Sequence, residues 1–273
     1  MGRKLLFTVE KQRVLVPVGQ PCPFGCRYCY TRGGEVGLAE VAVEEIMTAF
    51  TQFARTASFE TIQFGYDGDP FARPERGLAM LWQLVSMRKH INFSTKAALS
   101  EADFRELAEI HDAMKAMGTT LSALISLSCW ESAARVEPHT PTPQERITTL
   151  VGLKRLGLPT FISVRPIVPT IADSEYERIV DAGLRAGCDG FILGPLYADA
   201  RGLFVRFIQP SALQATPSRR GAVSWSAHAP TWTRYEDVER LARFIQMIEQ
   251  KGGQSFCSSA DAMALLQQEV HVA

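Results

Sequence analysis

The sequence predicts an α/β fold built on a parallel sheet, arranged as a barrel or partly closed barrel, with a doubly wound open sheet as the competing architecture. Two observations carry this prediction. Short apolar segments typical of strands alternate with amphipathic segments of about 10–15 residues that are typical of helices. Six such units follow one another between residues 14 and 195, and strands that alternate with helices in this way lie parallel in one sheet.

Local patterns place the individual elements. In the segment 41–55, for example, Val43, Ile46, Phe50 and Phe53 recur at helical spacing and form one apolar face. The predicted strands are 14–18, 61–65, 91–95, 121–127, 161–168 and 190–193. The predicted helices between them are 41–55, 76–88, 101–117, 143–156 and 174–186.

The pattern breaks from Leu196 to Thr233, where glycine and proline punctuate the chain. An irregular segment of this length is either a functional loop or structure that local patterns fail to detect. An amphipathic helix beginning near Val238 and an apolar tail follow it. We therefore expect residues 1–195 to form the core and residues 196–273 to form an irregular loop plus a short C-terminal helical extension that packs on it, within one structural domain.

Composition narrows the choice of partners. Lysine plus arginine equals aspartate plus glutamate, 29 of each in 273 residues, so the whole chain offers no electrostatic basis for binding nucleic acid or an anionic membrane. No stretch is long and apolar enough for a membrane span, and the first residues do not resemble a signal peptide. We expect a cytoplasmic protein without a membrane partner.

Three of the six cysteines, Cys22, Cys26 and Cys29, are spaced C-x3-C-x2-C among proline and glycine, which predicts a loop. Three thiolates can ligate three irons of a [4Fe–4S] cluster and leave the fourth iron open for a reacting ligand. A structural zinc site prefers four ligands, and no fourth lies nearby in the sequence. The spacing favours iron–sulfur, while a non-catalytic zinc-binding module remains the alternative.

The motif resembles that of radical S-adenosylmethionine (SAM) enzymes, in which an aromatic residue, here Tyr28, precedes the last cysteine. Within that superfamily the chain is most similar to the branch of spore photoproduct lyase. The resemblance covers roughly residues 14–195. The stretches that carry it beyond the cysteine loop are 64–75, 94–96, 126–128, Glu137-Pro138 with Arg146, and 166–169 with Asp173.

The resemblance implies a partial (β/α)6 TIM-type barrel with the cluster in the loop after the first strand. It also implies that SAM chelates the open iron and that an electron, from a donor such as flavodoxin or ferredoxin, cleaves it to a 5′-deoxyadenosyl radical. That radical would abstract hydrogen from an unidentified substrate at the barrel mouth.

Site residues carried over by position lie at the carboxyl ends of the predicted strands, where ligands gather in such folds. Tyr28 would lie by the adenine, and Gly68 and Asp69 stand where the family's motif meets the SAM amino group, with aspartate in place of glutamate. Lys96 and Ser126 would reach the SAM carboxylate or ribose. The further cofactor-binding candidates are Ser128, Arg146 and Arg165.

The sequence indicates the reaction less clearly than it indicates the cofactors. Spore photoproduct lyase repairs DNA with an extra cysteine after its second strand, but residues 65–76 contain no cysteine. DNA photoproduct repair, which would use a basic patch around Arg219 and Arg220, therefore stands as an alternative, and nucleic acid is the less favoured partner. Cys129, after the fourth strand, and Cys257, in the tail, are the candidate hydrogen donors.

Overall fold

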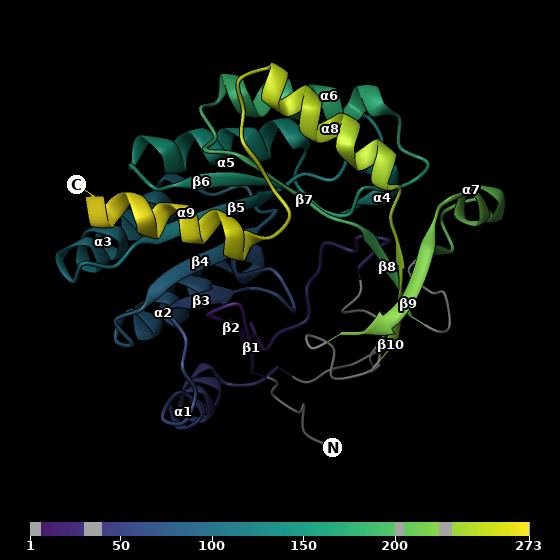
Figure 1. Cartoon of the computed structure of the whole chain (residues 1–273). Helices are drawn as coiled ribbons and strands as arrows, with labels where there is room; N and C mark the ends of the chain where they lie inside the picture. Colours follow the sequence, from purple (N-terminus) through teal and green to yellow (C-terminus); the bar gives the residue numbers. More distant parts are fainter. Residues whose placement is uncertain (1–6, 30–39, 200–204, 224–230, 273) are drawn as a thin grey trace.

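The protein is described here by a computed structural model that covers residues 7–29, 40–199, 205–223 and 231–272 (Figure 1). Its main sheet has eight strands in the order β1-β2-β3-β4-β5-β6-β7-β11. All neighbours from β2 onward are parallel, and β1 pairs antiparallel to β2. The strands are β1 Thr8–Glu10, β2 Arg13–Val16, β3 Thr61–Phe64, β4 His90–Thr95, β5 Leu121–Ser126, β6 Thr160–Val164, β7 Phe191–Leu193 and β11 Ser255–Phe256.

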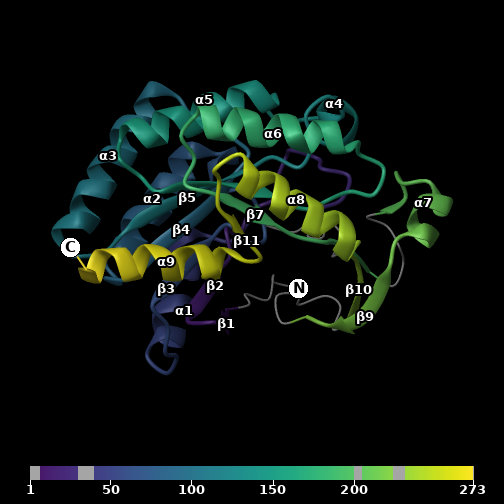
Figure 2. The same ribbon diagram turned by 45° about the horizontal axis from the view of Figure 1, so that its top comes forward.

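Helices between successive strands cover the outer face of this sheet (Figures 1 and 2). Ile162 and Val164 of β6 belong to the core beneath these helices, because alternate residues of a strand point to the same face. The helices are α1 Val43–Ala54, α2 Pro74–Val85, α3 Glu101–Ala116, α4 Ala133–Val136, α5 Pro143–Arg155, α6 Asp173–Arg185 and α8 Val238–Gln250, with a 3₁₀ turn η2 at Pro70–Ala72. The six predicted strands and five predicted helices of the core are present, with ends displaced by a few residues.

The inner face of the sheet is covered by the C-terminal helix α9 (Ser259–Val272). Ala262 and Met263 of α9 pack against Leu124 of β5, Phe161 of β6 and Ile192 of β7 in a second apolar cluster. The apolar tail expected from the sequence therefore fills the lower part of the barrel interior.

The start of α9 also closes the open side of the barrel. The Ser259 hydroxyl donates to Gln63 Oε1 of β3 at 2.9 Å and accepts from the Arg13 guanidinium of β2. Lys11 Nζ lies 3.0 Å from Asp261 Oδ1. Because β11, immediately before Ser259, pairs with β7, this short crossing segment joins the two edges of the partial barrel.

The segment from Leu196 to Thr233, expected to be irregular, contains a second sheet. Strands β8 (Leu196–Ala198), β10 (Thr231–Tyr235) and β9 (Ser218–Ala222) form an antiparallel sheet, and α7 (Pro210–Ala215) precedes β9. This sheet lies beside the main sheet in Figure 1. Its strands are short, β9 is exposed along its whole length, and β8 pairs with a strand more than 30 residues away, so local periodicity does not reveal the sheet.

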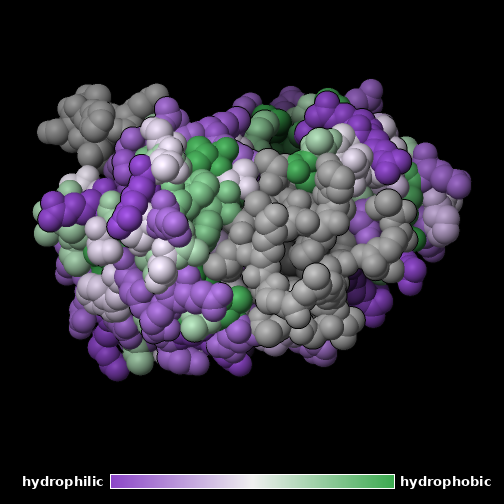
Figure 3. All heavy atoms as spheres, turned by 90° about the horizontal axis from the view of Figure 1, so that it is seen from below, coloured by the Kyte–Doolittle hydropathy of each residue, from purple (hydrophilic) through white to green (hydrophobic). Residues whose placement is uncertain are grey.

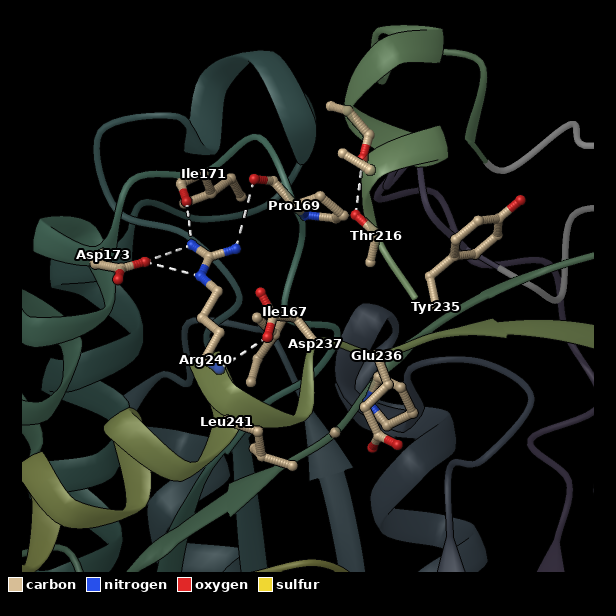
Figure 4. Close-up of a pocket in the computed structure, with 14 residues that line it drawn as sticks. Ile167, Pro169, Ile171, Asp173, Thr216, Tyr235, Glu236, Asp237, Arg240 and Leu241 are labelled. Carbon is tan, nitrogen blue, oxygen red and sulfur yellow. Dashed lines mark hydrogen bonds and ion pairs between the residues drawn. The ribbon is translucent and has the colours of Figure 1, made fainter. Parts of the chain in front are cut away.

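Arg240 holds helix α8 against the barrel through contacts with the segment that follows β6. Its guanidinium donates to Asp173 Oδ1 at 2.8 Å and to Ile171 O (Figure 4). It also donates to Val168 O at 3.1 Å. Arg240, Asp173 and Ile171 line a cavity of about 430 Å³ between α8, α7 and the loop after β6. Because the protein itself engages the guanidinium on every side, we interpret Arg240 as a structural clamp.

The surface offers few large apolar side chains. Among the described residues only Val9, Trp82 and Val238 are large hydrophobic residues that are exposed. Seen from below, hydrophobic residues gather in a strip left of centre, and hydrophilic residues cover most of the surrounding surface (Figure 3). No helix in the described ranges is both long enough and apolar enough to cross a membrane.

Candidate active site

A cavity of about 590 Å³ lies at the carboxyl ends of the barrel strands. Its walls come from the cysteine loop, the inner face of the barrel, the three-stranded sheet and the segment after β11. Ten of the residues singled out in the sequence line it: Cys22, Cys26, Cys29, Tyr28, Gly68, Asp69, Lys96, Ser126, Arg165 and Cys257. Because these residues span 235 positions of the sequence (257 − 22), only the barrel topology brings them together.

The cysteine loop follows β2 and is fixed by backbone contacts with the segment after β5. Arg27 N donates to Val136 O at 2.9 Å, and His139 N donates to Phe24 O at 3.2 Å. Gly25 adopts a φ of 68°, a conformation that other residues rarely take, and so lets the chain turn between the first two cysteines. Cys26 is buried, while Cys22 and Cys29 are half-buried.

The electrostatics of the loop suit a metal cluster. Burial raises the pKa of Cys22 to about 11 and that of Cys26 to about 12, although the Lys96 ammonium opposes the rise at Cys26. Cysteine binds iron as the thiolate, so a bound cluster would supply the positive charge that offsets this burial. No group of three or more His, Cys, Asp or Glu side chains within the described residues converges on one metal ion, whereas a [4Fe–4S] cluster places its cysteines on separate irons.

Asp69, expected near the SAM amino group, is deeply buried beside the loop. Its Oδ1 accepts hydrogen bonds from Thr95 Oγ1 at 2.7 Å and Phe71 N at 3.0 Å, and its Oδ2 accepts one from Lys96 N at 2.6 Å. Burial raises the pKa of Asp69, and these hydrogen bonds oppose the rise. The carboxylate thus positions the backbone after β3 and β4, and its direct contact with the cofactor stays a prediction, as does that of Gly68.

Glu137 is the centre of a buried charge cluster that the sequence alone did not identify. Its side chain is fully buried, with Oε2 2.7 Å from Arg146 Nη2 and Oε1 3.3 Å from Lys96 Nζ. The Tyr28 hydroxyl also donates to it, and Lys96 Nζ lies 5.7 Å from the centre of the Tyr28 ring. Burial alone raises the pKa of Glu137, but the two cations outweigh it and hold that pKa below its usual value.

Ser128 and Arg146 lie behind the cavity wall. Arg146 is fully buried and donates through Nη1 to Ser126 O at 2.8 Å. Ser128 is fully buried, its Oγ lies 3.0 Å from Tyr28 Oη, and its hydroxyl donates to Arg165 O. Neither side chain lines the cavity, and the cofactor contacts expected of these two residues stay predictions.

The two candidate hydrogen donors lie in different environments. Cys129 is fully buried in the main core and does not line the cavity, contrary to the expectation that it faces it. Cys257 is exposed and lines the cavity, and its carbonyl accepts a hydrogen bond from Arg165 Nη2 at 2.5 Å. Of the two cysteines, only Cys257 keeps the placement that a hydrogen donor requires.

This difference predicts thiol reactivity. Burial raises the pKa of Cys129 well above its usual value and that of Cys188 to about 12, which suppresses the nucleophilic thiolate. We expect iodoacetamide to modify Cys257 in the anaerobically reconstituted protein at least about tenfold faster than it modifies Cys129 or Cys188. Peptide mass spectrometry over a time course measures the three rates, and faster labelling of Cys129 would contradict the placement described here.

Comparisons with solved structures bear on the fold. Spore photoproduct lyase complexed with dinucleoside spore photoproduct aligns with a TM-score of 0.65 at 14% identity, covering 92% of this chain and 78% of that one. Streptococcus suis SuiB bound to S-adenosylmethionine aligns with a TM-score of 0.57 at 13% identity, and the match covers 88% of this chain but only 47% of SuiB. These likenesses confirm the partial barrel.

Comparisons of the amino-acid sequence identify relatives of this chain and its family. Uncharacterized protein Rv2578c of Mycobacterium tuberculosis is 24% identical over 246 residues, which cover 82% of this chain and 71% of that protein. Uncharacterized protein Mb2609c of Mycobacterium bovis matches equally. Residues 16–183, more than half of the chain, match the family described as the Radical SAM superfamily. The chain therefore belongs to the Radical SAM superfamily and is an enzyme of that class.

Proposed function

We propose that this enzyme holds a [4Fe–4S] cluster on Cys22, Cys26 and Cys29, cleaves SAM reductively beside it, and directs the resulting radical at a substrate in the same cavity. The observation that carries the proposal is the convergence of these cysteines, Tyr28 and Lys96 on one cavity of about 590 Å³. Low-potential electrons would come from a donor such as flavodoxin or ferredoxin.

The cluster and SAM, when bound, supply a 5′-deoxyadenosyl radical able to abstract a hydrogen atom. The residues of this chain would bind SAM and orient it. The Lys96 ammonium faces the cavity, is held by Glu137, and is suited to the SAM carboxylate. The Tyr28 ring, fixed at its hydroxyl by Glu137 and Ser128, offers an apolar face to the adenine. Ser126 lines the cavity between them and presents a hydroxyl to the ribose.

Anaerobic reconstitution tests this function. The protein treated with iron and sulfide is expected to bind four irons and to release 5′-deoxyadenosine when dithionite and SAM are added. Chromatography and mass spectrometry measure that product, and EPR spectroscopy of the reduced protein identifies the cluster. A protein that instead binds one zinc ion tightly and releases no 5′-deoxyadenosine would overturn the proposal.

DNA photoproduct repair is the second candidate, because a solved structure of spore photoproduct lyase with its dinucleoside photoproduct shares this fold. The basic patch expected around Arg219 and Arg220 is weaker than the adjacency of these two residues in the sequence indicates. Arg219 and Arg220 are successive residues of β9, so their side chains point to opposite faces of the strand. Repair predicts DNA binding that weakens steeply with salt and on replacing both arginines with alanine; salt-independent binding would exclude it.

A further inference from the structure

The outer strand β9 (Ser218–Ala222) of the three-stranded sheet has an open edge. The strand order is β8-β10-β9, so β9 has a partner on one side only. All five of its residues are exposed, and no strand in the described part of the chain pairs with its other side. A free edge of this kind offers a row of backbone donors and acceptors to an added strand.

The pairing of β9 with β10 determines which backbone groups face that edge. Glu236 N donates to Pro217 O at 2.9 Å, and these two residues lie opposite each other when the register of the strands is continued by one position. In an antiparallel pair, residues that exchange hydrogen bonds alternate with residues that do not. Counting from Pro217, the N–H and C=O groups of Ser218, Arg220 and Ala222 therefore point away from β10, toward the open edge.

The same strand carries two arginine side chains without partners. Neither Arg219 nor Arg220 has a side-chain hydrogen bond or an ion pair in the ranges that the structure describes. Opposite them on β10 lie Arg234 and Thr233, and neither of these residues supplies a negative charge. A carboxylate on an added strand, directly opposite either arginine, would be attracted to it, whereas a lysine or arginine there would be repelled.

This charge selects among the partners that could occupy the edge. Two copies of β9 paired with each other would bring the arginines of one copy close to those of the other, and charged edges commonly prevent such self-association. Nucleic acid would be attracted to the arginines, but it cannot continue the alternating donors and acceptors of a sheet. A polypeptide strand with acidic side chains matches both the backbone groups and the arginines of β9.

The strand β9 leads directly into the active-site cavity. Its last residue, Ala222, and the next residue, Val223, line that cavity together with the cysteine loop. The cavity has a volume of about 590 Å³ and would also hold SAM, so the greater part of a long substrate would lie outside it. A strand paired with β9 would continue past Ala222 into this space and bring one of its own residues within reach of the radical.

We propose that the substrate is a peptide or protein with an acidic extended segment, which adds to β9 as a further strand of the small sheet and delivers a neighbouring residue to the cavity. Recognition of this kind takes its affinity from main-chain hydrogen bonds and its selectivity from side chains. Arg219 and Arg220 point to opposite faces of β9, so two successive acidic residues on the added strand would contact them. The inference rests on the proposed function, since it names the substrate class of the same cavity.

Fluorescence anisotropy with the reconstituted enzyme at fixed, low ionic strength tests the proposal. The probe is the peptide Thr-Val-Thr-Glu-Glu-Thr-Val-Thr with blocked ends and a neutral dye. We expect this probe to bind, and Arg219→Gln and Arg220→Gln each to weaken the binding about threefold, because each variant removes one cross-strand ion pair. Arg105→Gln is the matched control: Arg105 is an exposed arginine of α3, which lies far from β9 in Figures 1 and 2, so binding should not change.

Methylation of the probe's backbone nitrogens gives a readout that attraction between charges would not move. Methyl groups on alternate residues remove the N–H donors of one edge of the probe strand, and methyl groups on the intervening residues remove those of the other edge. We expect one of these two methylated probes to bind at least about tenfold more weakly, because it loses several main-chain hydrogen bonds, and the other to keep its affinity.

Three results would overturn the inference: no binding of the acidic probe, equal binding of a probe with lysine in place of glutamate, or equal loss with the two methylated probes. Tighter binding of a single-stranded DNA oligonucleotide, with the same dependence on Arg219 and Arg220, would assign the arginines to nucleic acid and overturn it as well. All four results leave 5′-deoxyadenosine release intact, whereas failure of the proposed function abolishes that release whatever the peptide does.

Discussion

Cys26→Ala is expected to abolish both the [4Fe–4S] cluster and the release of 5′-deoxyadenosine. Cys26 is the most buried of the three cysteines and lies beside Lys96 and the Glu137 cluster. Two cysteines cannot retain a cluster that already has one iron without a protein ligand. Iron and sulfide analysis, EPR of the dithionite-reduced protein and chromatography of the reaction measure these losses.

Cys188→Ala provides the control for that experiment. Cys188 lies after α6, packs against the core and does not line the cavity. Its replacement is expected to leave iron content and SAM cleavage unchanged, with a modest loss of stability because one small side chain leaves the core. A normal [4Fe–4S] signal in Cys26→Ala would show that the ligands are assigned wrongly.

Glu137→Gln is expected to lower the free energy of unfolding by about 3 kcal/mol, because removing one member of a buried charge cluster leaves its partners uncompensated. Arg146 and Lys96 would then face each other without the carboxylate that now lies between them. The loss of a negative charge near Cys26 should also raise the midpoint potential of the cluster, by on the order of tens of millivolts. Denaturant unfolding of the cluster-free protein and an EPR-monitored redox titration measure the two effects.

Glu175→Gln separates these two effects. Glu175 is also a buried carboxylate, and it accepts hydrogen bonds from Trp130 N at 2.8 Å, Ser132 N at 3.0 Å and Ser132 Oγ at 2.6 Å. It does not line the cavity. We expect this variant to lose stability and to keep the midpoint potential of the native enzyme. If both glutamine variants shifted the potential equally, Glu137 would have no special relation to the cluster.

The core of the fold was predictable because its elements are local. The helix predicted over 143–156 is α5, Pro143–Arg155, whose capping box at Thr142 and Glu145 fixes its start. The strand predicted over 161–168 ends earlier, at Val164, because Pro166 has no N–H to donate to the sheet. The three-stranded sheet was missed because its strands are short, because β9 is fully exposed and so shows no apolar alternation, and because Thr231–Tyr235 also pairs with the distant strand Leu196–Ala198.

The site was predictable to the extent that it depends on strand order. Lys96 and Ser126 follow separate strands, yet both line the cavity because parallel strands end at the same edge of the barrel. Glu137 was noted only within a stretch that resembles the family and was not predicted to be a site residue.

The segment that crosses the barrel after β11 bears on how this enzyme is made. The cysteine loop is complete at residue 29, but the contacts of Ser259 with Arg13 and Gln63 form only after some 230 further residues have been synthesised. Chains fold progressively from the N-terminus during synthesis, so the cluster-binding loop exists for most of that time without its last wall. The residues around Ser259 are thus the last part of this wall to be added. Until they are in place, the cysteine loop stays accessible from that side for insertion of the cluster.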